Sequence, residues 1–385
     1  ICMNITNDIL YIGVNDHETD LFEGQYIIPN GIAYNAYLIM DEKIAIMDTV
    51  DMKKCDDFLN NLEAALNGKT PDYVVVHHVE PDHASSLKVL LDKYPTLQVV
   101  TSSGAKNVLP LYHDIDLSNA IIVKEGSELN LGKHTLKFIA APMVHWPEVV
   151  MSYDICDKVL FSADAFGKFG ALDVEEDWDC EARRYYFNIV GKFGVQVQNV
   201  LKKAATLDIQ TICPLHGPIL SETIPHVLKQ YNTWSSYGVE TEGVYIAYVS
   251  MHGNTAKVAE KMKEILLEKG CPKVAFTDIA REDPAEALED AFRYGKVILA
   301  APTYNMGVMP LMADFLHHLS LKNYQNKTIG LIENGSWAPA AAKTMKAALA
   351  EMKNITIVEP VVTVKGALKD SYTDALNALA DAILK

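Results

Sequence analysis

Residues 73–83 read YVVVHHVEPDH, an apolar strand followed at once by metal-ligand side chains. The run Tyr73–Val76 is continuous and largely β-branched, which is typical of a buried parallel strand. Two imidazoles and two carboxylates follow within six positions: His78, Glu80, Asp82 and His83. Because Pro81 disfavours the helical region for the residue before it, we expect these ligands on an extended turn, with a helix restarting over residues 84–91. Four such side chains at this spacing predict a metal site.

Three more ligand-type side chains occur where later apolar runs end. His145 follows the predicted strand Thr135–Ala140, and the others are Asp164 and His216. Ligands gathered at strand ends are typical of the carboxyl edge of an open α/β sheet. We expect six other histidines at the surface or as capping residues: His17, His113, His134, His226, His317 and His318.

The length of 385 residues and a hydrophobic content of 49% are enough for two cores of ordinary size. No run approaches eighteen consecutive apolar residues and no leader-like segment opens the chain, so we expect a soluble, cytoplasmic protein without a membrane partner. Ile1 and Cys2 precede Met3, which could be the natural start. The six cysteines form no CxxC pair, which argues against a disulfide framework, a zinc ribbon or a fused rubredoxin module.

The formal net charge of −16 is concentrated in the first part of the chain. Residues 1–242 contain 34 of the 50 acidic residues and 18 of the 34 basic ones, so the remainder is neutral. Bound cations at the predicted metal site would offset part of this excess. Because no basic stripe is available to neutralise phosphates, we expect no nucleic-acid partner.

The chain has two predicted domains, residues 1–241 and 242–385. In the first, strands extend from Ile9 to Val50, a helix spans Lys53–Leu66, and a long helix spans Glu181–Ala205. A stretch rich in Tyr, Thr, Ser and Gly, residues 231–243, separates it from a clearer strand–helix alternation. No internal repeat is visible.

Three strands of the second domain end in loops suited to a flavin. The strand Val244–Val249 precedes a helix over Ala256–Lys269, and the loop between them offers backbone N–H groups, hydroxyls and a helix dipole to a phosphate monoester. The strands Val297–Ala300 and Thr328–Ile332 end in aromatic turns. The three predicted FMN loops are Ser250, Met251, His252, Gly253, Asn254 and Thr255; Pro302, Thr303, Tyr304, Asn305, Met306 and Gly307; and Asn334, Gly335, Ser336 and Trp337. This arrangement is typical of a flavodoxin-like domain, with Trp337 expected to stack on the isoalloxazine.

The first-domain ligands resemble the metallo-β-lactamase fold, whose hydrolases carry an HxHxDH run, then a His, a bridging Asp and a last His. Asp48 also matches the strand-end Asp of that fold. Glu80 departs from the hydrolase pattern, and a carboxylate in place of imidazole shifts a site from zinc toward iron or manganese. The resemblance implies one metal on His78, Glu80 and His145, a second on Asp82, His83 and His216, and Asp164 between them.

An HxExDH metallo-β-lactamase-like domain followed by a flavodoxin-like domain resembles the flavodiiron proteins, also called A-type flavoproteins. The resemblance covers nearly the whole chain in its minimal two-domain form. It implies an αββα domain followed by a doubly wound parallel sheet, a non-haem di-iron centre on the seven ligands, and FMN on the three loops. No catalytic residue beyond the metal ligands is implied.

The family reduces dioxygen to water, nitric oxide to nitrous oxide, or both. The resemblance therefore implies an oxidoreductase that receives electrons from rubredoxin or a similar redox protein, or from the deazaflavin coenzyme F420. It also implies a head-to-tail homodimer or a dimer of such dimers, with each flavin serving the metal site of the other protomer. Trp146, beside His145, would then lie near the interface.

Two other hypotheses remain open at this point. The chain could be a metal-dependent hydrolase that activates water on zinc and carries an accessory flavodoxin domain. It could also be a pure electron carrier whose first domain holds no metal. Glu80 argues against the hydrolase, and the complete ligand set argues against the carrier.

Overall fold

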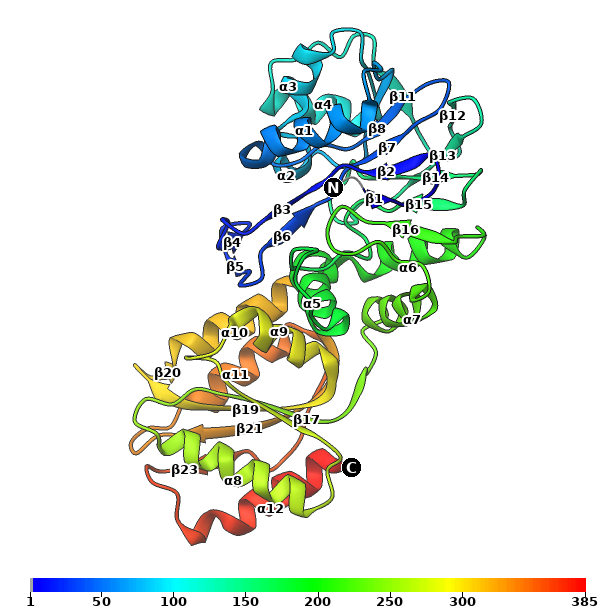
Figure 1. Cartoon of the computed structure of the whole chain (residues 1–385). Helices are drawn as coiled ribbons and strands as arrows, with labels where there is room; N and C mark the ends of the chain where they lie inside the picture. The colour runs from blue at the N-terminus through cyan, green and yellow to red at the C-terminus, as the bar shows by residue number, and fades with distance from the viewer. Residues whose placement is uncertain (1–2) are drawn as a thin grey trace. The chain divides into compact units, whose positions relative to one another are not determined.

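A computed structural model describes residues 3–385 of the chain, so Ile1 and Cys2 lie outside the described residues. The chain divides into two compact units, each shown in Figure 1. The first extends to Tyr185 and includes Val195–Tyr231, and the second consists of Tyr186–Gly194 and Asn232–Lys385. The domain boundary between residues 241 and 242 stays a prediction.

The first unit contains a mixed seven-stranded sheet with the order β1-β2-β7-β8-β9-β10-β11. Its strands are β1 (Met3–Asn4), β2 (Ile9–Tyr11), β7 (Tyr37–Ile39), β8 (Ala45–Met47), β9 (Tyr73–Val76), β10 (Gln98–Ser102) and β11 (Ile121–Val123). Neighbours are antiparallel from β1 to β8 and parallel from β8 to β11. The predicted strand Tyr73–Val76 is therefore a central parallel strand, and its last three residues are buried.

A second, five-stranded sheet has the order β12-β13-β14-β15-β16. Its strands are β12 (Glu128–Asn130), β13 (Thr135–Ala140), β14 (Val150–Asp154), β15 (Val159–Phe161) and β16 (Thr211–Cys213). Only the last pair, β15 with β16, is parallel. Two short ribbons complete the strands of this unit: β3 (Val14–Asp16) with β6 (Ile32–Tyr34), and β4 (Leu21–Phe22) with β5 (Tyr26–Ile27).

The two sheets pack face to face between helices, which gives the αββα layers expected from the sequence (Figure 1). The shared core joins Met47 and Val75 of the first sheet to Phe138 and Phe161 of the second. The helical segments are the 3₁₀ turn Met52–Lys54, α1 (Cys55–Leu66), α2 (Pro81–Ala84), α3 (Leu87–Lys93), α4 (Ser103–Tyr112), α5 (Trp178–Tyr185), α6 (Gly194–Ala204) and α7 (Ile224–Ser235). The shared core holds the two sheets together, and the residues that follow β9, β15 and β16 gather at one edge of them.

The second unit is a parallel sheet with the order β18-β17-β19-β21-β22. Its strands are β17 (Thr241–Tyr248), β18 (Val274–Asp278), β19 (Tyr294–Tyr304), β20 (Gly307–Val308), β21 (Gln325–Asn334), β22 (Lys353–Ile357) and β23 (Val362–Val364). β20 pairs antiparallel with β19, and β23 pairs parallel with β21. Numbered along the unit, this is the 2-1-3-4-5 order of flavodoxin-like folds, which confirms the predicted class.

Helices cover both faces of this parallel sheet (Figure 1). They are α8 (Asn254–Glu268), α9 (Pro284–Arg293), α10 (Pro310–Leu321), α11 (Ala341–Ala350) and α12 (Thr373–Leu384), with a 3₁₀ turn at Asp370–Tyr372. On one face, Leu266 of α8 and Leu379 of α12 pack with Ile246 and Ile298 of the strands. The doubly wound arrangement leaves the carboxyl edge of the sheet free for loops.

Three predicted helical features differ from the observed ones. The helix expected over residues 84–91 is two helices, α2 and α3, and Asp82 and His83 lie in α2 rather than on an extended turn. The long helix Glu181–Ala205 is interrupted by a π-helical segment at Tyr186–Val190 and a 3₁₀ turn at Gly191–Phe193. Part of the stretch predicted as a separator belongs to α7. Periodicity alone could not locate these breaks, since the apolar spacing continues through them.

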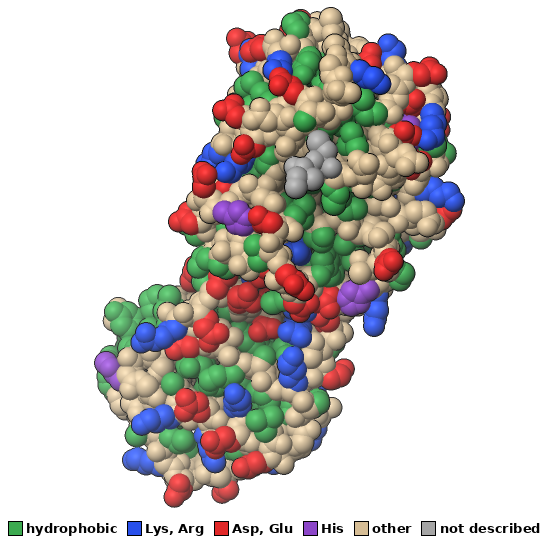
Figure 2. All heavy atoms as spheres, in the orientation of Figure 1, with side chains coloured by type: hydrophobic (Ala, Val, Ile, Leu, Met, Phe, Trp, Pro, Cys, Tyr) green, Lys and Arg blue, Asp and Glu red, His purple; other side chains and the backbone are tan. Residues whose placement is uncertain are grey.

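The surface carries both signs of charge. On the face shown in Figure 2, Lys and Arg side chains are scattered among Asp and Glu rather than gathered into a stripe. Over residues 3–385, the helices are all too short or too polar to traverse a lipid bilayer.

The expectation that His134 lies at the surface is wrong. Its side chain is fully buried, with Nδ1 3.0 Å from Asp154 Oδ2 and Nε2 3.2 Å from Asp8 Oδ2. The hydrogen bond to Asp154, opposed by burial and supported by Asp8, raises the pKa of His134 to about 9. Both acids are distant in sequence, so the residues around His134 carry no sign of them.

His134 should make stability depend on pH. Because its pKa is raised in the folded state, the stabilisation is complete below the unfolded value of about 6.5 and is lost as pH rises through about 9. We expect His134→Gln to lower the free energy of unfolding by roughly 1–3 kcal/mol at pH 6 and by much less at pH 10. Thermal unfolding followed by circular dichroism at both pH values measures this. His17→Gln, at an exposed imidazole, is the control, and an equal loss at both pH values would contradict the prediction.

Candidate metal centre and flavin-binding hollow

The predicted metal ligands come from strand ends of both sheets of the first unit. His78 follows β9, Asp164 follows β15 and His216 follows β16. His145 lies between β13 and β14, and Glu80 immediately precedes α2. Glu80 has the extended conformation expected before a proline (φ −56°, ψ 140°), and Pro81 then begins the helical turn that carries Asp82 and His83.

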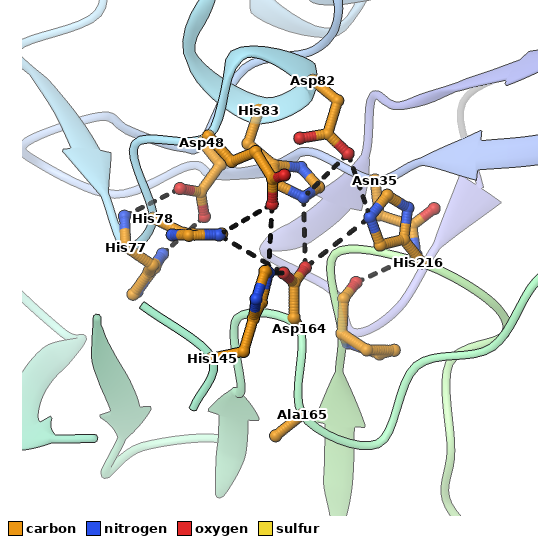
Figure 3. Close-up of polar contacts among 12 residues, drawn as sticks. Asn35, Asp48, His77, His78, Asp82, His83, His145, Asp164, Ala165 and His216 are labelled. Atoms are coloured by element: carbon orange, nitrogen blue, oxygen red, sulfur yellow. Dashed lines mark hydrogen bonds and ion pairs between the residues drawn. The ribbon is translucent and has the colours of Figure 1, made fainter. Parts of the chain in front are cut away.

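The structure brings all seven predicted ligands together in two adjacent groups. Figure 3 labels six of them: His78, Asp82, His83, His145, Asp164 and His216. In the first group, His145 Nε2 lies 3.0 Å from Glu80 Oε2 and 3.2 Å from Asp164 Oδ2. His78 Nε2 lies 3.2 Å from the same Glu80 oxygen and 3.4 Å from the same Asp164 oxygen. Donors that bind one ion at about 2.1 Å are separated by about 3.0–3.4 Å, so these spacings suit a shared cation.

The second group faces the other oxygen of Asp164. His83 Nε2 lies 3.1 Å and His216 Nε2 3.6 Å from Asp164 Oδ1. Asp82 Oδ2 lies 3.2 Å from His216 Nε2 and 3.4 Å from His83 Nε2. Asp164 therefore presents one carboxylate oxygen to each group, and the groups share it.

The hydrogen-bonding state of these atoms fits metal binding. Several buried donor and acceptor atoms lack a hydrogen-bond partner within residues 3–385: both carboxylate oxygens of Asp82 and Asp164, both ring nitrogens of His83, and Nε2 of His216. Buried polar atoms are normally paired, so such a concentration requires an explanation. Two cations, one in each group, would satisfy the atoms that point inward.

The electrostatics also favour cations. Burial disfavours charge on the imidazoles, yet nearby carboxylates raise the pKa of His83 and His145 to about 9. Burial alone would raise the pKa of Asp164, but His83 and His145 outweigh it and hold that pKa well below its ordinary value. The carboxylates therefore make the electrostatic potential inside the cluster negative, and this outweighs the cost of burying positive charge there.

Aromatic side chains surround the second group. Phe22, Tyr34 and Tyr185 lie with ring centroids 5.3, 6.0 and 5.7 Å from that of His216. Trp146 lies edge-on to His78, with centroids 5.2 Å apart. These rings cover His216 and His78, whereas the ligands Glu80 and Asp82 border a hollow of about 250 Å³ that Phe22 and Tyr34 also line.

Two buried residues beside the ligands, His77 and Glu148, were not predicted from the sequence. His77 is fully buried, and Asp48 accepts a hydrogen bond from its backbone N (2.7 Å) and lies 2.5 Å from its Nδ1 (Figure 3). Glu148 lies 2.7 Å from Nδ1 of His78. A carboxylate three residues after His145 was the available signal, because ligand histidines usually donate their second ring N–H to an acid or carbonyl.

The flavin loops of the second unit border a hollow of about 360 Å³. Thirteen of the sixteen predicted residues line it; Gly253, Met306 and Gly307 belong to the same loops but are not in the lining. Gly366 also lines it and was missed. Its N–H donates to Asn334 Oδ1 (3.0 Å) and its carbonyl accepts from Asn334 Nδ2 (2.9 Å), which joins the loop after β23 to the loop after β21.

The hollow suits a phosphate-bearing aromatic ligand. Ser250 Oγ is buried without a hydrogen-bond partner within residues 3–385, beside the N-terminus of the fifteen-residue helix α8. A free hydroxyl and a helix N-terminus together favour an anion. Tyr304 and Trp337 at the rim remain 44% and 68% exposed, so both rings are available to contact a planar ligand.

The fold and these two sites define a two-domain protein with a β-lactamase-like metal domain and a flavodoxin-like domain. The profile described as "ODP family beta lactamase" matches residues 32–217, and the one described as "Flavodoxin domain" matches residues 245–373. The chain is 30% identical over 372 residues to a nitric oxide reductase of Moorella thermoacetica, covering 94% of this chain and 92% of that protein.

Solved structures of related proteins resemble this chain over its full length. The rubredoxin oxygen:oxidoreductase of the anaerobe Desulfovibrio gigas has a TM-score of 0.93 at 27% identity, covering 100% of this chain and 98% of that one. The flavodiiron protein of Giardia intestinalis has a TM-score of 0.92 at 26% identity, covering 99% and 96%. The chain belongs to the flavodiiron protein family.

Ser250 can be tested as a phosphate contact. Ser250→Ala should lower FMN affinity about tenfold or more, because a hydrogen bond to a charged group contributes about 1.5–3 kcal/mol. Fluorescence quenching during FMN titration of flavin-depleted protein measures the affinity. Ser371→Ala, at an exposed position of the same unit, should leave it unchanged. Equal affinities for both variants would count against the phosphate position.

Proposed function

We propose that the chain is an FMN- and di-iron-dependent reductase of dioxygen to water, of nitric oxide to nitrous oxide, or of both. The observation that supports this most is the ligand set, in which Asp164 is shared by two groups and Glu80 adds a carboxylate to the first. Carboxylate oxygens beside imidazoles suit iron better than a histidine-rich zinc site would. Two nearly full-length relatives, the Moorella nitric oxide reductase and the Desulfovibrio oxygen:oxidoreductase, support the same reaction class.

Each of the two ligand groups would hold one iron. One iron would be held by His78, Glu80 and His145, the other by Asp82, His83 and His216, with Asp164 bridging. FMN would occupy the hollow, with its phosphate at Ser250–Thr255 and its ring near Tyr304 and Trp337. Bound iron would supply the redox-active sites for the gas, and bound FMN would supply the electrons stored for its reduction.

Aromatic side chains beside the cluster leave room for a small apolar gas rather than a large substrate. Burial and the charge of Asp164 raise the pKa of Tyr185 well above its usual range, so its hydroxyl keeps its proton next to the cluster. Phe22, Tyr34 and Tyr185 restrict water around His216. A hollow of about 250 Å³ that reaches Glu80 and Asp82 would give a small molecule such as O₂ or NO access to the cluster.

We further propose a cytoplasmic homodimer in which each flavin serves the metal cluster of the other protomer, as a dimer or a dimer of dimers. The exposed apolar rim of the flavin hollow supports a protein partner there, since Met251, Tyr304, Met306 and Trp337 all remain at least 43% exposed. The half-buried Trp146 beside His78 would face this rim. Rubredoxin or a similar redox protein, or coenzyme F420, would deliver electrons, and no nucleic acid or membrane is needed.

Because the metal ligands and the flavin hollow lie in different units, gas consumption should be lost without loss of FMN when a metal ligand is replaced. His145→Ala or Asp164→Ala should abolish O₂ and NO consumption while FMN stays bound, because both side chains lie in the metal cluster and not in the flavin hollow. Parallel O₂ and NO electrode assays after anaerobic reduction, with flavin content from the visible spectrum, measure both effects. Asp116→Ala, at an exposed carboxylate of the same unit, is the control.

Four outcomes would refute the proposal. Unchanged gas consumption in either variant, or loss of flavin, would contradict the assignment of roles. Purified protein that contains zinc and hydrolyses esters or lactams would instead support the hydrolase hypothesis, and protein without bound metal after anaerobic purification would support the electron carrier.

A further inference from the structure

Glu148 lies directly behind the metal ligand His78. Its Oε1 is 2.7 Å from Nδ1 of His78 and 3.1 Å from the backbone N of Val79, which donates to it. Both side chains are almost completely buried. Because an ionised carboxylate can only accept hydrogen bonds, Nδ1 of His78 donates to Glu148, which leaves Nε2 as the ring nitrogen that would bind a metal ion in the ligand group.

The position of Glu148 is fixed from a separate element. Ser102, which caps α4, donates its hydroxyl to the backbone carbonyl of Glu148 (2.7 Å). Gly104 in the first turn of α4 approaches so closely that a Cβ there would lie 2.9 Å from Cβ of Glu148. The carboxylate is therefore held by packing as well as by its contact with His78.

A buried glutamate at position 148 costs folding free energy that a neutral residue with the same structural role would not cost. Oε2 of Glu148 is buried without a hydrogen-bond partner among residues 3–385. A neutral acceptor at this position would satisfy His78 and Val79 without burying a charge or leaving an oxygen unpaired. The burial of a negative charge at this position therefore requires a functional explanation.

The two ligand groups differ in this respect. In the second group, Nδ1 of His216 lies 2.8 Å from the carbonyl oxygen of Ala33, a neutral acceptor. In the first group the corresponding acceptor is the Glu148 carboxylate. Each group otherwise has two carboxylates, Glu80 and Asp164 in the first and Asp82 and Asp164 in the second, so Glu148 is what distinguishes them. A carboxylate behind a ligand histidine raises the basicity of the ring and fixes its orientation, whereas a carbonyl fixes orientation with a weaker electronic effect.

We propose that Glu148 is a positioning residue that makes the two metal sites unequal. It holds His78 in the ligating tautomer and, through its negative charge, binds the ion of the first group more tightly and stabilises that ion's oxidised state. This inference rests on the proposed di-iron function and adds to it an assignment of which iron is held more firmly and reduced last.

Glu148→Gln tests the proposal because the amide keeps an acceptor at the same place and removes the charge. We expect the variant to fold and retain FMN but to release one of its two irons to a chelator roughly 10–100 times faster than the wild type. The potential at which the second iron is reduced should shift to more positive values in an anaerobic titration followed by EPR. Glu128→Gln, an exposed carboxylate of the same unit, is the matched control and should match the wild type.

Glu148→Asp separates charge from packing. It keeps the charge while withdrawing the oxygen from His78, so its reduction potential should lie closer to the wild type than that of Glu148→Gln. For Glu148→Gln, faster iron release without any change in potential would indicate a merely structural role and overturn the proposal, as would two variants identical to the wild type. If Glu148→Gln does not fold, iron release from Glu148→Asp at the wild-type rate overturns the positioning role. Wild-type protein without iron would refute the di-iron function itself, which is a distinguishable failure.

Discussion

The carboxylate of Asp164 is the contact on which the metal site depends. It is buried at the end of β15 and presents Oδ2 to one group of ligands and Oδ1 to the other. An isolated buried carboxylate is costly, so the site is stable only with cations or protonated imidazoles on both sides. The face-to-face sheets meet this constraint, because they bring β9 of one sheet and β15 and β16 of the other to a common edge. The ligands on the loops then follow from the fold.

The second unit also places its candidate binding site at the carboxyl ends of strands, but for a flavin rather than a metal. Its parallel strands end in loops at the point where the strand order reverses, between β17 and β19, which is where open α/β sheets bind ligands. Asn334 and Gly366 tie two of these loops together, and Ser250 leaves a buried hydroxyl unpaired beside the N-terminus of α8. Metal and flavin are thus each served by one compact unit, which is the basis for the proposed separation of electron storage from gas reduction.

Much of the site could be predicted because its residues are local in sequence. Four ligands occur within six residues, and Glu80 alone shifts the predicted chemistry from zinc toward iron. The supporting contacts could not be predicted in this way. Glu148 reaches His78 across 70 positions, and Asp8 and Asp154 reach His134 across 126 and 20, so only folding reveals that these charges are paired. The π-helical break at Tyr186–Val190 likewise has no signature in the apolar spacing.

The two proposed ions that share Asp164 can be observed directly. Crystals of anaerobically purified protein, measured at the iron absorption edge, should give two anomalous peaks on either side of the Asp164 carboxylate. One peak should lie among His78, Glu80 and His145, and the other among Asp82, His83 and His216. A single peak, or two peaks that appear at the zinc edge and not at the iron edge, would contradict a di-iron centre bridged by Asp164.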